Sequence, residues 1–255
     1  MHRFAAPVAL AALLVALPFP RGGTDPAPGA AGADSADRAR ALHLLGRITY
    51  GPRPGDVDRV LAMGIDKYLD QQLHPDRIAD TVAERAVQAF PVLKMSLTEL
   101  ARREQRVRQE NQRRQRQTGD SMRPDPANNP PPPNSEAGQL RRLISGFQQA
   151  AVVRAALSDR QLYEVMVDFW TNHFNIYMAK GIDRVLMPSY IEETIRPNAL
   201  GTFEALLTAT AKSPAMMFYL DNAESVTPGA QAPRAQGFGR RGFAPGFGFP
   251  PNGRG

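Results

Sequence analysis

The stretch Leu162-Tyr-Glu-Val-Met-Val-Asp-Phe-Trp-Thr-Asn-His173 decides the fold class, because it is the most regular amphipathic segment of the chain. Its large apolar side chains and its histidine recur at intervals of three residues or one: Leu162, Val165, Met166, Phe169, Trp170 and His173. This spacing places all six side chains on one face of an α-helix. We therefore predict a helix whose apolar face, with Trp170 and His173 on it, points into the core.

The segments around this helix have the same helical period. Upstream, a stripe that begins after Glu136 contains six apolar residues: Leu140, Leu143, Ile144, Phe147, Ala150 and Ala151. Downstream, we expect one helix to start at Pro188, a second to contain Phe203, Leu206, Leu207 and Thr210, and a third to follow the cap Ser213-Pro214. Residues 136–222 are therefore predicted to form the helical core.

The N-terminal segment, residues 36–101, also has a helical pattern. Apolar residues recur at helical spacing from Leu42 to Ile48, until Gly51-Pro-Arg-Pro54 stops the run. Two short helices follow, which we expect to end at Gly64 and at His74-Pro75. No run of alternating apolar and polar residues indicates a strand. The predicted fold is all-α, an irregular multi-helix bundle.

Low-complexity stretches interrupt and follow this pattern. Residues 102–117 are rich in Arg and Gln, which favour a solvated helix with almost nothing to bury, and residues 118–135 form a linker around Asn128-Asn-Pro-Pro-Pro-Pro-Asn134. Of residues 228–255, 13 are Gly or Pro, a composition that cannot bury enough surface to fold alone. We therefore predict a disordered insert within residues 102–135 and a disordered tail over residues 223–255.

The composition is that of a globular protein, with 42% hydrophobic and 22% charged residues. The absence of cysteine excludes disulfides, thiolate zinc sites and cysteine nucleophiles. The net charge of +6 is located in appendages: residues 102–117 hold seven Arg and two Glu, and residues 228–255 hold four Arg and no acid. The predicted core is therefore slightly acidic, which disfavours nucleic acid as its partner.

The first 33 residues have the layout of a secretory signal peptide. His2 and Arg3 precede an uncharged, largely apolar stretch from Phe4 to Pro20, and Ala31-Gly-Ala33 supplies a small-residue cleavage site. An uncleaved membrane anchor is the alternative, but two prolines within the apolar stretch shorten its unbroken helix. We expect an exported protein, located in the periplasm, at the cell surface or outside the cell, with no transmembrane span after signal removal.

Two stretches of unusual sequence recur together in a known family. The first is Leu42-His-Leu-Leu-Gly-Arg-Ile-Thr-Tyr-Gly-Pro-Arg-Pro-Gly-Asp-Val57 with Gly64-Ile-Asp-Lys-Tyr-Leu-Asp-Gln-Gln-Leu73. The second, more specific stretch joins four parts: Met166-Val-Asp-Phe-Trp-Thr-Asn-His-Phe-Asn175, Ile195-Arg-Pro-Asn-Ala-Leu-Gly-Thr-Phe203, Ala211-Lys-Ser-Pro-Ala-Met216 and Tyr219-Leu-Asp-Asn222. Together they resemble the N-terminal part of a bacterial family known as domain of unknown function 1800.

The resemblance implies an exported, helical bacterial protein without an established activity. It also implies a longer protein, because members of the family continue into a second half that begins with an Asn-Glu-Asn…Ala-Arg-Glu…Glu-Leu-His type segment. Members often carry a histidine where this chain has Thr171, and some carry one where it has Asn198. If those histidines serve a metal or acid–base site, this chain lacks two of its members.

His173 is the residue around which a catalytic or metal site can be imagined, because imidazole binds metals and exchanges protons near neutral pH. Polar residues near it in the sequence or downstream of it complete the set: Asp168, Asn172, Asn175, Glu192 and Glu193. In the alternative interpretation, His173 shares the buried stripe and hydrogen-bonds a backbone group in the core. The chain has no His-x-x-x-His pair or equivalent, which favours the structural interpretation.

The other polar candidates also have structural explanations. Helix caps and surface hydrogen bonds account for Asp168, Asn172 and the pair Asp221-Asn222. Glu192-Glu193 lies near the expected start of a helix, where the macrodipole favours acids. These explanations are preferred to a catalytic role.

The arginines of residues 102–117 are candidates for binding an anionic polymer, such as nucleic acid or a teichoic or lipopolysaccharide-type surface: Arg102, Arg103, Arg106, Arg108, Arg113, Arg114 and Arg116. The run lacks aromatic residues that would stack on bases, so a solvated, frayed helix is the preferred interpretation. The stretch Gly237-Phe-Gly-Arg-Arg-Gly-Phe243 is similar to Arg/Gly-rich RNA-binding tails, but an exported linker explains it equally well.

No phosphate loop, nucleophile elbow, dinucleotide fingerprint or zinc-protease motif is present. We therefore expect an exported helical module that binds a partner protein or an envelope polymer and does not catalyse a reaction. The alternative is a divergent exported hydrolase or metal-dependent enzyme centred on His173 and Asp168, incomplete in this chain. The sequence indicates no cofactor and no substrate.

Overall fold

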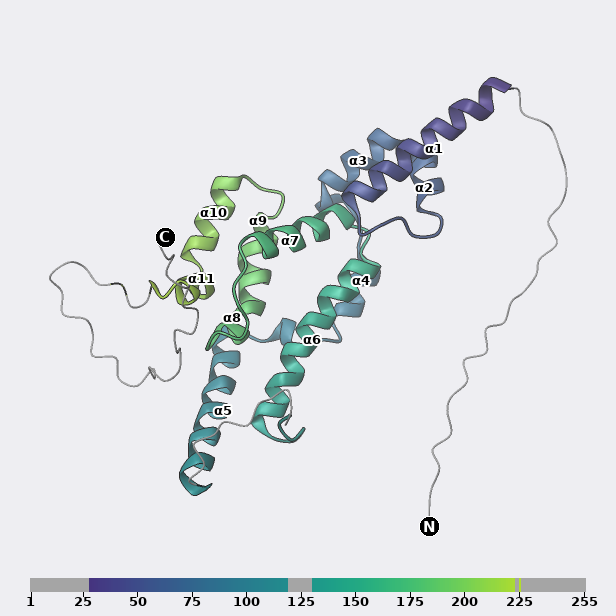
Figure 1. Ribbon diagram of the computed structural model, residues 1–255. Coiled ribbons are helices and arrows are strands. Elements are labelled where there is room, and N and C mark those ends of the chain that lie inside the picture. Colours follow the sequence, from purple (N-terminus) through teal and green to yellow (C-terminus); the bar gives the residue numbers. More distant parts are fainter. Residues whose placement is uncertain (1–27, 119–129, 223–224, 226–255) are drawn as a thin grey trace, which may run out of the picture.

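The computed structural model describes residues 28–118, 130–222 and 225, and every regular element within them is helical (Figure 1). The elements are α1 (Pro28–Ile48), α2 (Asp56–Met63), α3 (Ile65–Leu73), η1 (Pro75–Arg77), α4 (Thr81–Val87), η2 (Pro91–Lys94), α5 (Leu97–Thr118), α6 (Glu136–Leu157), α7 (Gln161–His173), α8 (Asp183–Ser189), η3 (Tyr190–Ile195), α9 (Arg196–Asn198), α10 (Phe203–Lys212) and α11 (Pro214–Tyr219). The predicted all-α fold is confirmed. The predictions of disorder for residues 119–129 and for nearly all of 223–255 fall outside the described residues.

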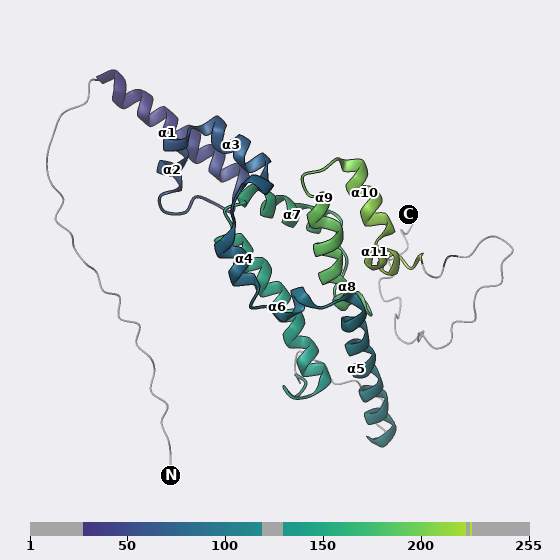
Figure 2. The same cartoon turned by 180° about the vertical axis from the view of Figure 1, so that it is seen from behind.

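Helices α1, α2 and α3 form a small cluster at one end of the molecule (Figures 1 and 2). The core of this cluster is Ala41, Leu45, Val60 and Tyr68. Gly64 separates α2 from α3 with φ at 94°, a left-handed value that favours glycine, and the predicted helix end at Gly64 is confirmed. Leu42, the first residue of the apolar run in α1, is 50% exposed. The side of α1 that packs against α2 and α3 contains Ala41 and Leu45 instead.

The larger core joins α5, α6 and α7 to the C-terminal helices. Within α6, the predicted stripe holds for Leu140, Phe147 and Ala150, which are buried, while Ala151 faces solvent. The predicted cap before α11 is confirmed, because the Oγ of Ser213 accepts a hydrogen bond from the backbone N–H of Met216. Local sequence therefore predicts where α11 begins and most of the buried side of α6.

Three helical elements, α8, η3 and α9, follow one another without a break. Pro188 was expected at the start of a helix, but it is the sixth residue of α8, which begins at Asp183. Proline cannot donate a backbone hydrogen bond inside a helix, and the turn that follows it widens into the π-helix η3. Glu192 and Glu193 lie in this π-helix, so their expected position near the start of an α-helix is wrong.

The helix predicted over the Arg/Gln-rich residues is present as α5, but its first half belongs to the core. Glu104 and Val107 are each 3% exposed. The carboxylate of Glu104 accepts hydrogen bonds from Arg108 on its own helix and from Arg184 of α8. The expectation that this run has almost nothing to bury is therefore wrong up to Val107 and holds for residues 111–117, which are exposed.

Helix α7 is present as predicted, but its buried face is not the predicted one. The most buried residues are Gln161, Glu164 and Val167, whereas Phe169 and His173 are exposed. The predicted inward direction of the apolar stripe is therefore wrong for Phe169 and His173, whereas Trp170 is partly buried and packs against the core. The physical reason is that polar partners from other helices meet Gln161 and Glu164 and turn that side of α7 inward.

The predicted signal segment falls almost entirely on residues 1–27, outside the described part of the chain. Helix α1 begins at Pro28, upstream of the expected start at Ala36, and contains the residues of the expected cleavage site, Ala31-Gly-Ala33. Within residues 28–118 and 130–222, none of the helices combines the length and the hydropathy needed to span a bilayer. The signal peptide and export stay predictions.

Candidate interaction surface

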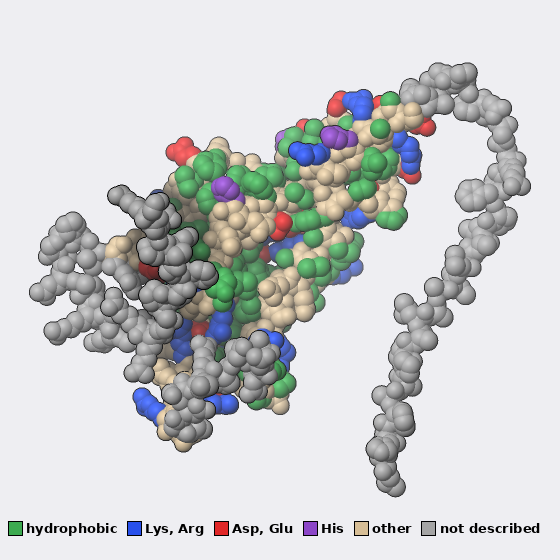
Figure 3. All heavy atoms as spheres, viewed as in Figure 1, with side chains coloured by type: hydrophobic (Ala, Val, Ile, Leu, Met, Phe, Trp, Pro, Cys, Tyr) green, Lys and Arg blue, Asp and Glu red, His purple; other side chains and the backbone are tan. Residues whose placement is uncertain are grey.

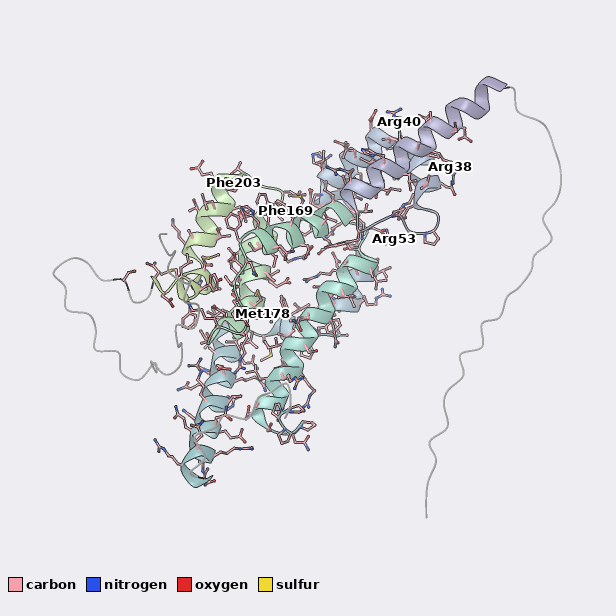
Figure 4. The ribbon with its side chains drawn as sticks, viewed as in Figure 1. Arg38, Arg40, Arg53, Phe169, Met178 and Phe203 are labelled. Atoms are coloured by element: carbon pink, nitrogen blue, oxygen red, sulfur yellow. The ribbon has the colours of Figure 1, made fainter. Side chains whose placement is uncertain are left out.

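Five aromatic side chains from α7, its C-terminal cap and α10 form one cluster, the aromatic patch: Phe169, Trp170, His173, Phe174 and Phe203. Figure 4 shows Phe169 and Phe203 on neighbouring parts of the same side of the molecule. The ring centroids of Phe169 and Trp170 are 4.8 Å apart, edge to face, and that of Trp170 is 6.0 Å from Phe203. The indole therefore links the rings of the two helices at distances typical of stabilising aromatic pairs.

The rim of the aromatic patch faces solvent. Phe169 is 51% exposed, Phe203 is 54% exposed, and Leu207, one turn after Phe203 on α10, is 45% exposed. Figure 3 shows hydrophobic side chains gathered over α7 and α10 on this face. Contiguous exposed apolar side chains of this kind mark interaction sites more often than single scattered ones.

The floor of the aromatic patch is fixed by hydrogen bonds to the helices beneath it. The indole N–H of Trp170 donates to the backbone oxygen of Ala199 at 3.0 Å. The hydroxyl of Tyr190, which is 2% exposed, donates to the backbone oxygen of Phe174 at 2.8 Å. These two bonds fix the indole of Trp170 and the backbone of Phe174 relative to the helices beneath.

The structure places His173 on the surface, at the last position of α7. Its ring stacks on that of Phe169 at 6.0 Å and 15°, and it meets the rings of Trp170 and Phe174 edge to face. The structural interpretation that put His173 in the core is therefore wrong. Its neighbours in the described structure are aromatic rings, and it contributes to the patch as one of them.

The acidic and amide residues expected around His173 do not gather there. Asp168 is exposed and precedes His173 by five residues, which puts the two side chains about 140° apart around a helix. The amide of Asn172 donates to the backbone oxygen of Asp168 at 2.9 Å, as expected for a surface hydrogen bond. Asn175 is exposed as well. Across the described part of the chain, no three His, Asp or Glu side chains meet in a way that could hold a metal ion.

Glu192 belongs instead to a chain of ion pairs that no local sequence pattern predicted. Arg196 binds Glu164 through two hydrogen bonds of 2.8 and 2.6 Å, and Arg154 binds Glu192 through two of 2.5 and 3.1 Å. Burial alone lowers the pKa of Arg196, but the hydrogen bonds and charge of Glu164 outweigh it and raise that pKa. The guanidinium therefore stays charged, and it holds α9, which precedes Ala199 and the start of α10, against α7.

A second polar network joins the first turn of α7 to the N-terminal cluster. Asp80, 6% exposed, accepts hydrogen bonds from the hydroxyl of Ser158 at 2.7 Å and from the backbone N–H of Asp159 at 2.9 Å. The side chain of Gln72 bonds to the backbone of Asp159 and Leu162. Both networks join residues distant in sequence, so local patterns could not have revealed them.

Asp183 is the one acid of α8 and is fully buried, and neither of its carboxylate oxygens has a hydrogen-bond partner within the described structure. Burial raises the pKa of Asp183 to about 6, with the positive charge of Lys180 opposing the shift and the carboxylate of Asp221 adding to it. Lys180 itself donates to the backbone oxygen of Tyr219 and to the carboxylate of Asp221. That ion pair places Asp221 on the surface, in agreement with the expected surface hydrogen bonding of Asp221-Asn222.

The structure pairs four of the seven candidate anion-binding arginines with acids. Arg103, Arg106, Arg108 and Arg114 lie within 4.0 Å of Glu99, Glu136, Glu104 and Glu110, respectively. Arg102, Arg113 and Arg116 are exposed and form no ion pair within the described residues. The strongest positive charge on α5 is therefore at its C-terminal end, and anion binding there stays a prediction.

Comparison with known proteins gives a family and no activity. No curated protein and no solved structure is detectably similar to the chain. The sequence profile of the family described as "Protein of unknown function (DUF1800)" matches residues 43–231. This range includes the C-terminal end of α1, from residue 43 onward, and all of α2 to α11. The chain therefore belongs to the DUF1800 family.

Proposed function

We propose that the chain is an exported, non-catalytic helical module that binds a partner protein through the aromatic patch. One observation carries the proposal: rings from two helices are fixed from below and left open above, with Phe169 and Phe203 about half exposed. Aromatic residues dominate the energetics of protein interfaces because they bury a large area with few rotatable bonds.

The kind of partner follows from the chemistry of the patch. Apolar rings offer no charge to recognise an anionic polymer, and they favour an extended polypeptide that presents apolar side chains. Leu207 widens the apolar surface along α10, which lengthens the contact beyond a single side-chain pocket. A polypeptide segment with aromatic or aliphatic residues is therefore the favoured ligand, ahead of the envelope polymer.

An enzymatic role has weaker support. A hydrolase or metal-dependent enzyme centred on His173 and Asp168 requires these side chains to converge, and their positions on α7 diverge. The carboxylates of Glu164 and Glu192 are both bound by arginines in ion pairs that hold helices together. The binding role is the function that the geometry supports best.

The test is site-specific photo-crosslinking in an envelope extract of the source organism. A benzophenone amino acid in place of Leu207, beside the patch, should form one discrete adduct with a polypeptide. The same amino acid in place of Val152, 68% exposed on α6, is the matched control and should not form that adduct.

Two further variants decide whether the adduct reports on the patch. Replacement of Phe169 and Phe203 by serine should remove the Leu207 adduct, whereas Asp168→Ala should leave it. The proposal fails if the adduct survives loss of both phenylalanines, or if crosslinks from Leu207 and Val152 are the same.

A further inference from the structure

The aromatic patch lies near the point where the chain leaves the described core. Helix α11 packs against α10, and α10 begins with Phe203 of the patch. A helix of ten residues is about 15 Å long, so Asn222 is within a few helical turns of the patch.

The sequence that follows has the composition of a ligand for such a patch. Residues 226–255 contain four phenylalanines, each set between small residues or prolines: Phe238, Phe243, Phe247 and Phe249. Fifteen residues separate Asn222 from Phe238, and a chain of that length reaches at most about 50 Å. The tether is therefore long enough to bring any of the four rings to the patch.

Charge is complementary as well. Residues 228–255 hold four arginines and no acid. Next to the two exposed rings of the patch lie Asp168 and Glu204, which are exposed and form no ion pair within the described residues. Arg240 and Arg241, which lie between Phe238 and Phe243, can thus meet these acids at the rim, and an arginine can also stack on the indole of Trp170.

We infer that residues 237–249 of the same chain occupy the aromatic patch and that a partner must displace them. A tether of this length gives an effective concentration of about 1 mM, so a contact with a Kd of about 0.1 mM is occupied roughly nine times in ten. A weak intramolecular contact therefore suffices to protect the exposed rings. The inference rests on the proposed function for the identity of the surface, and it adds the ligand present when no partner is bound.

Trp170 is the single tryptophan of the chain, so its fluorescence reports on the patch directly. The experiment measures acrylamide quenching in the full chain and in a variant with the four tail phenylalanines replaced by serine. The quenching constant should rise roughly twofold in that variant, because a patch occupied nine times in ten becomes open. The matched control replaces Ala230, Ala232, Ala235 and Ala244 by serine and should quench like the unmodified chain.

A synthetic peptide of residues 234–250 then completes the test. Added to the four-serine variant, it should return the quenching constant toward that of the unmodified chain, and the same peptide with serine at the Phe positions should not. Equal quenching in the unmodified chain and in both variants overturns the inference. Protection that grows with protein concentration also overturns it, because the tail of a second copy then fills the patch.

The crosslinking experiment separates this inference from the proposed function. If the tail does not protect Trp170 but Leu207 still forms its adduct, the proposed function stands and the inference fails. If the tail protects Trp170 and the four-serine variant yields no adduct, the inference stands and the binding of a separate partner fails.

Discussion

At the first turn of α7, Gln161 and Glu164 are 3% and 6% exposed, whereas near its last turn Phe169 is 51% exposed and His173 faces solvent. One end of the helix thus buries polar side chains, and the other end exposes aromatic ones. The ends differ in their neighbours: Glu164 meets the guanidinium of Arg196, while the exposed rings of Phe169 and His173 lie against other aromatic rings.

This contrast shows that partners decide burial more than polarity does. A buried carboxylate is tolerated when a guanidinium binds both of its oxygens, because the pair replaces the lost hydration. Exposed rings have no such compensation, because no polar group replaces the hydration that apolar surface lacks. The polar end of α7 is tied to other helices, and the aromatic end leaves the rings of Phe169 and His173 exposed to solvent.

The substitution expected to lower stability most is Glu164→Ala, at the polar end of α7. Removal of the carboxylate leaves Arg196, whose side chain is 14% exposed, charged without its main partner, which should cost about 3–5 kcal/mol of unfolding free energy. Urea unfolding followed by Trp170 fluorescence measures the loss. Asp168→Ala, at an exposed position of the same helix, should change stability by about 0.5 kcal/mol or less. Similar losses in both variants would contradict the contrast between buried and exposed acids.

Asp80→Ala tests the link between the polar end of α7 and the N-terminal cluster. The buried hydroxyl of Ser158 and the backbone N–H of Asp159 lose their shared acceptor, which should lower the unfolding free energy by about 2–3 kcal/mol. The exposed Asp76 supplies the control, since Asp76→Ala should be close to neutral. An equal stability of the Asp80 and Asp76 variants would show that the network contributes nothing.

Asp183 sharpens the comparison, because it is a buried acid without the partner that Glu164 has. A folded-state pKa of about 6, above the ordinary value of 3.8, means that the folded protein binds the proton more tightly than the unfolded chain does. The contribution of Asp183 to stability therefore falls as pH rises from about 4 to about 6 and stays low above that range.

The neutral variant Asp183→Asn should consequently be more stable than the unmodified protein at pH 7.5, by about 1–3 kcal/mol, and equally stable near pH 4. Denaturant unfolding at the two pH values measures both differences. A variant that is less stable at pH 7.5 would mean that the carboxylate of Asp183 is compensated by a partner.

The smallest effect on stability is expected at the aromatic end. Replacement of Phe169 and Phe203 by serine removes rings that are already about half exposed, so the unfolding free energy should change by about 1 kcal/mol or less. The same variant should lose its crosslink from position 207. A large loss of stability would instead assign these rings to the core and remove the case for an interaction surface.

Sequence patterns predicted most helices but not which side of α7 is buried. The apolar period of three and four residues in Leu162–His173 identified α7. The cap residue Ser213 predicted the start of α11, and Gly64 predicted the end of α2. The prediction of which face of α7 is buried was wrong because Arg196, the partner of Glu164, lies 32 residues further along the chain. Nothing in the local pattern around Glu164 indicates such a partner.

The candidate site was predicted in part. His173 was recognised as the notable residue of the most specific segment, and it does lie in the patch, but as an exposed ring stacked on Phe169. Phe203 was expected on an apolar stripe, and its contact with Trp170 depends on how α9 turns the chain before α10. The contact joins residues of α7 and α10, and the apolar pattern of neither helix predicts how the two helices lie relative to each other.

The sequence by itself determined membership of the family, and it determined the helical class and the ends of several helices, because helix formation follows from hydrogen bonds and side-chain periods within a few residues. The tertiary structure alone decided that Glu164 is buried, that Asp183 is buried without a partner and that the rings around Trp170 form a surface. Burial depends on which distant side chains satisfy a charge or cover a ring, and those neighbours are chosen only when the helices pack.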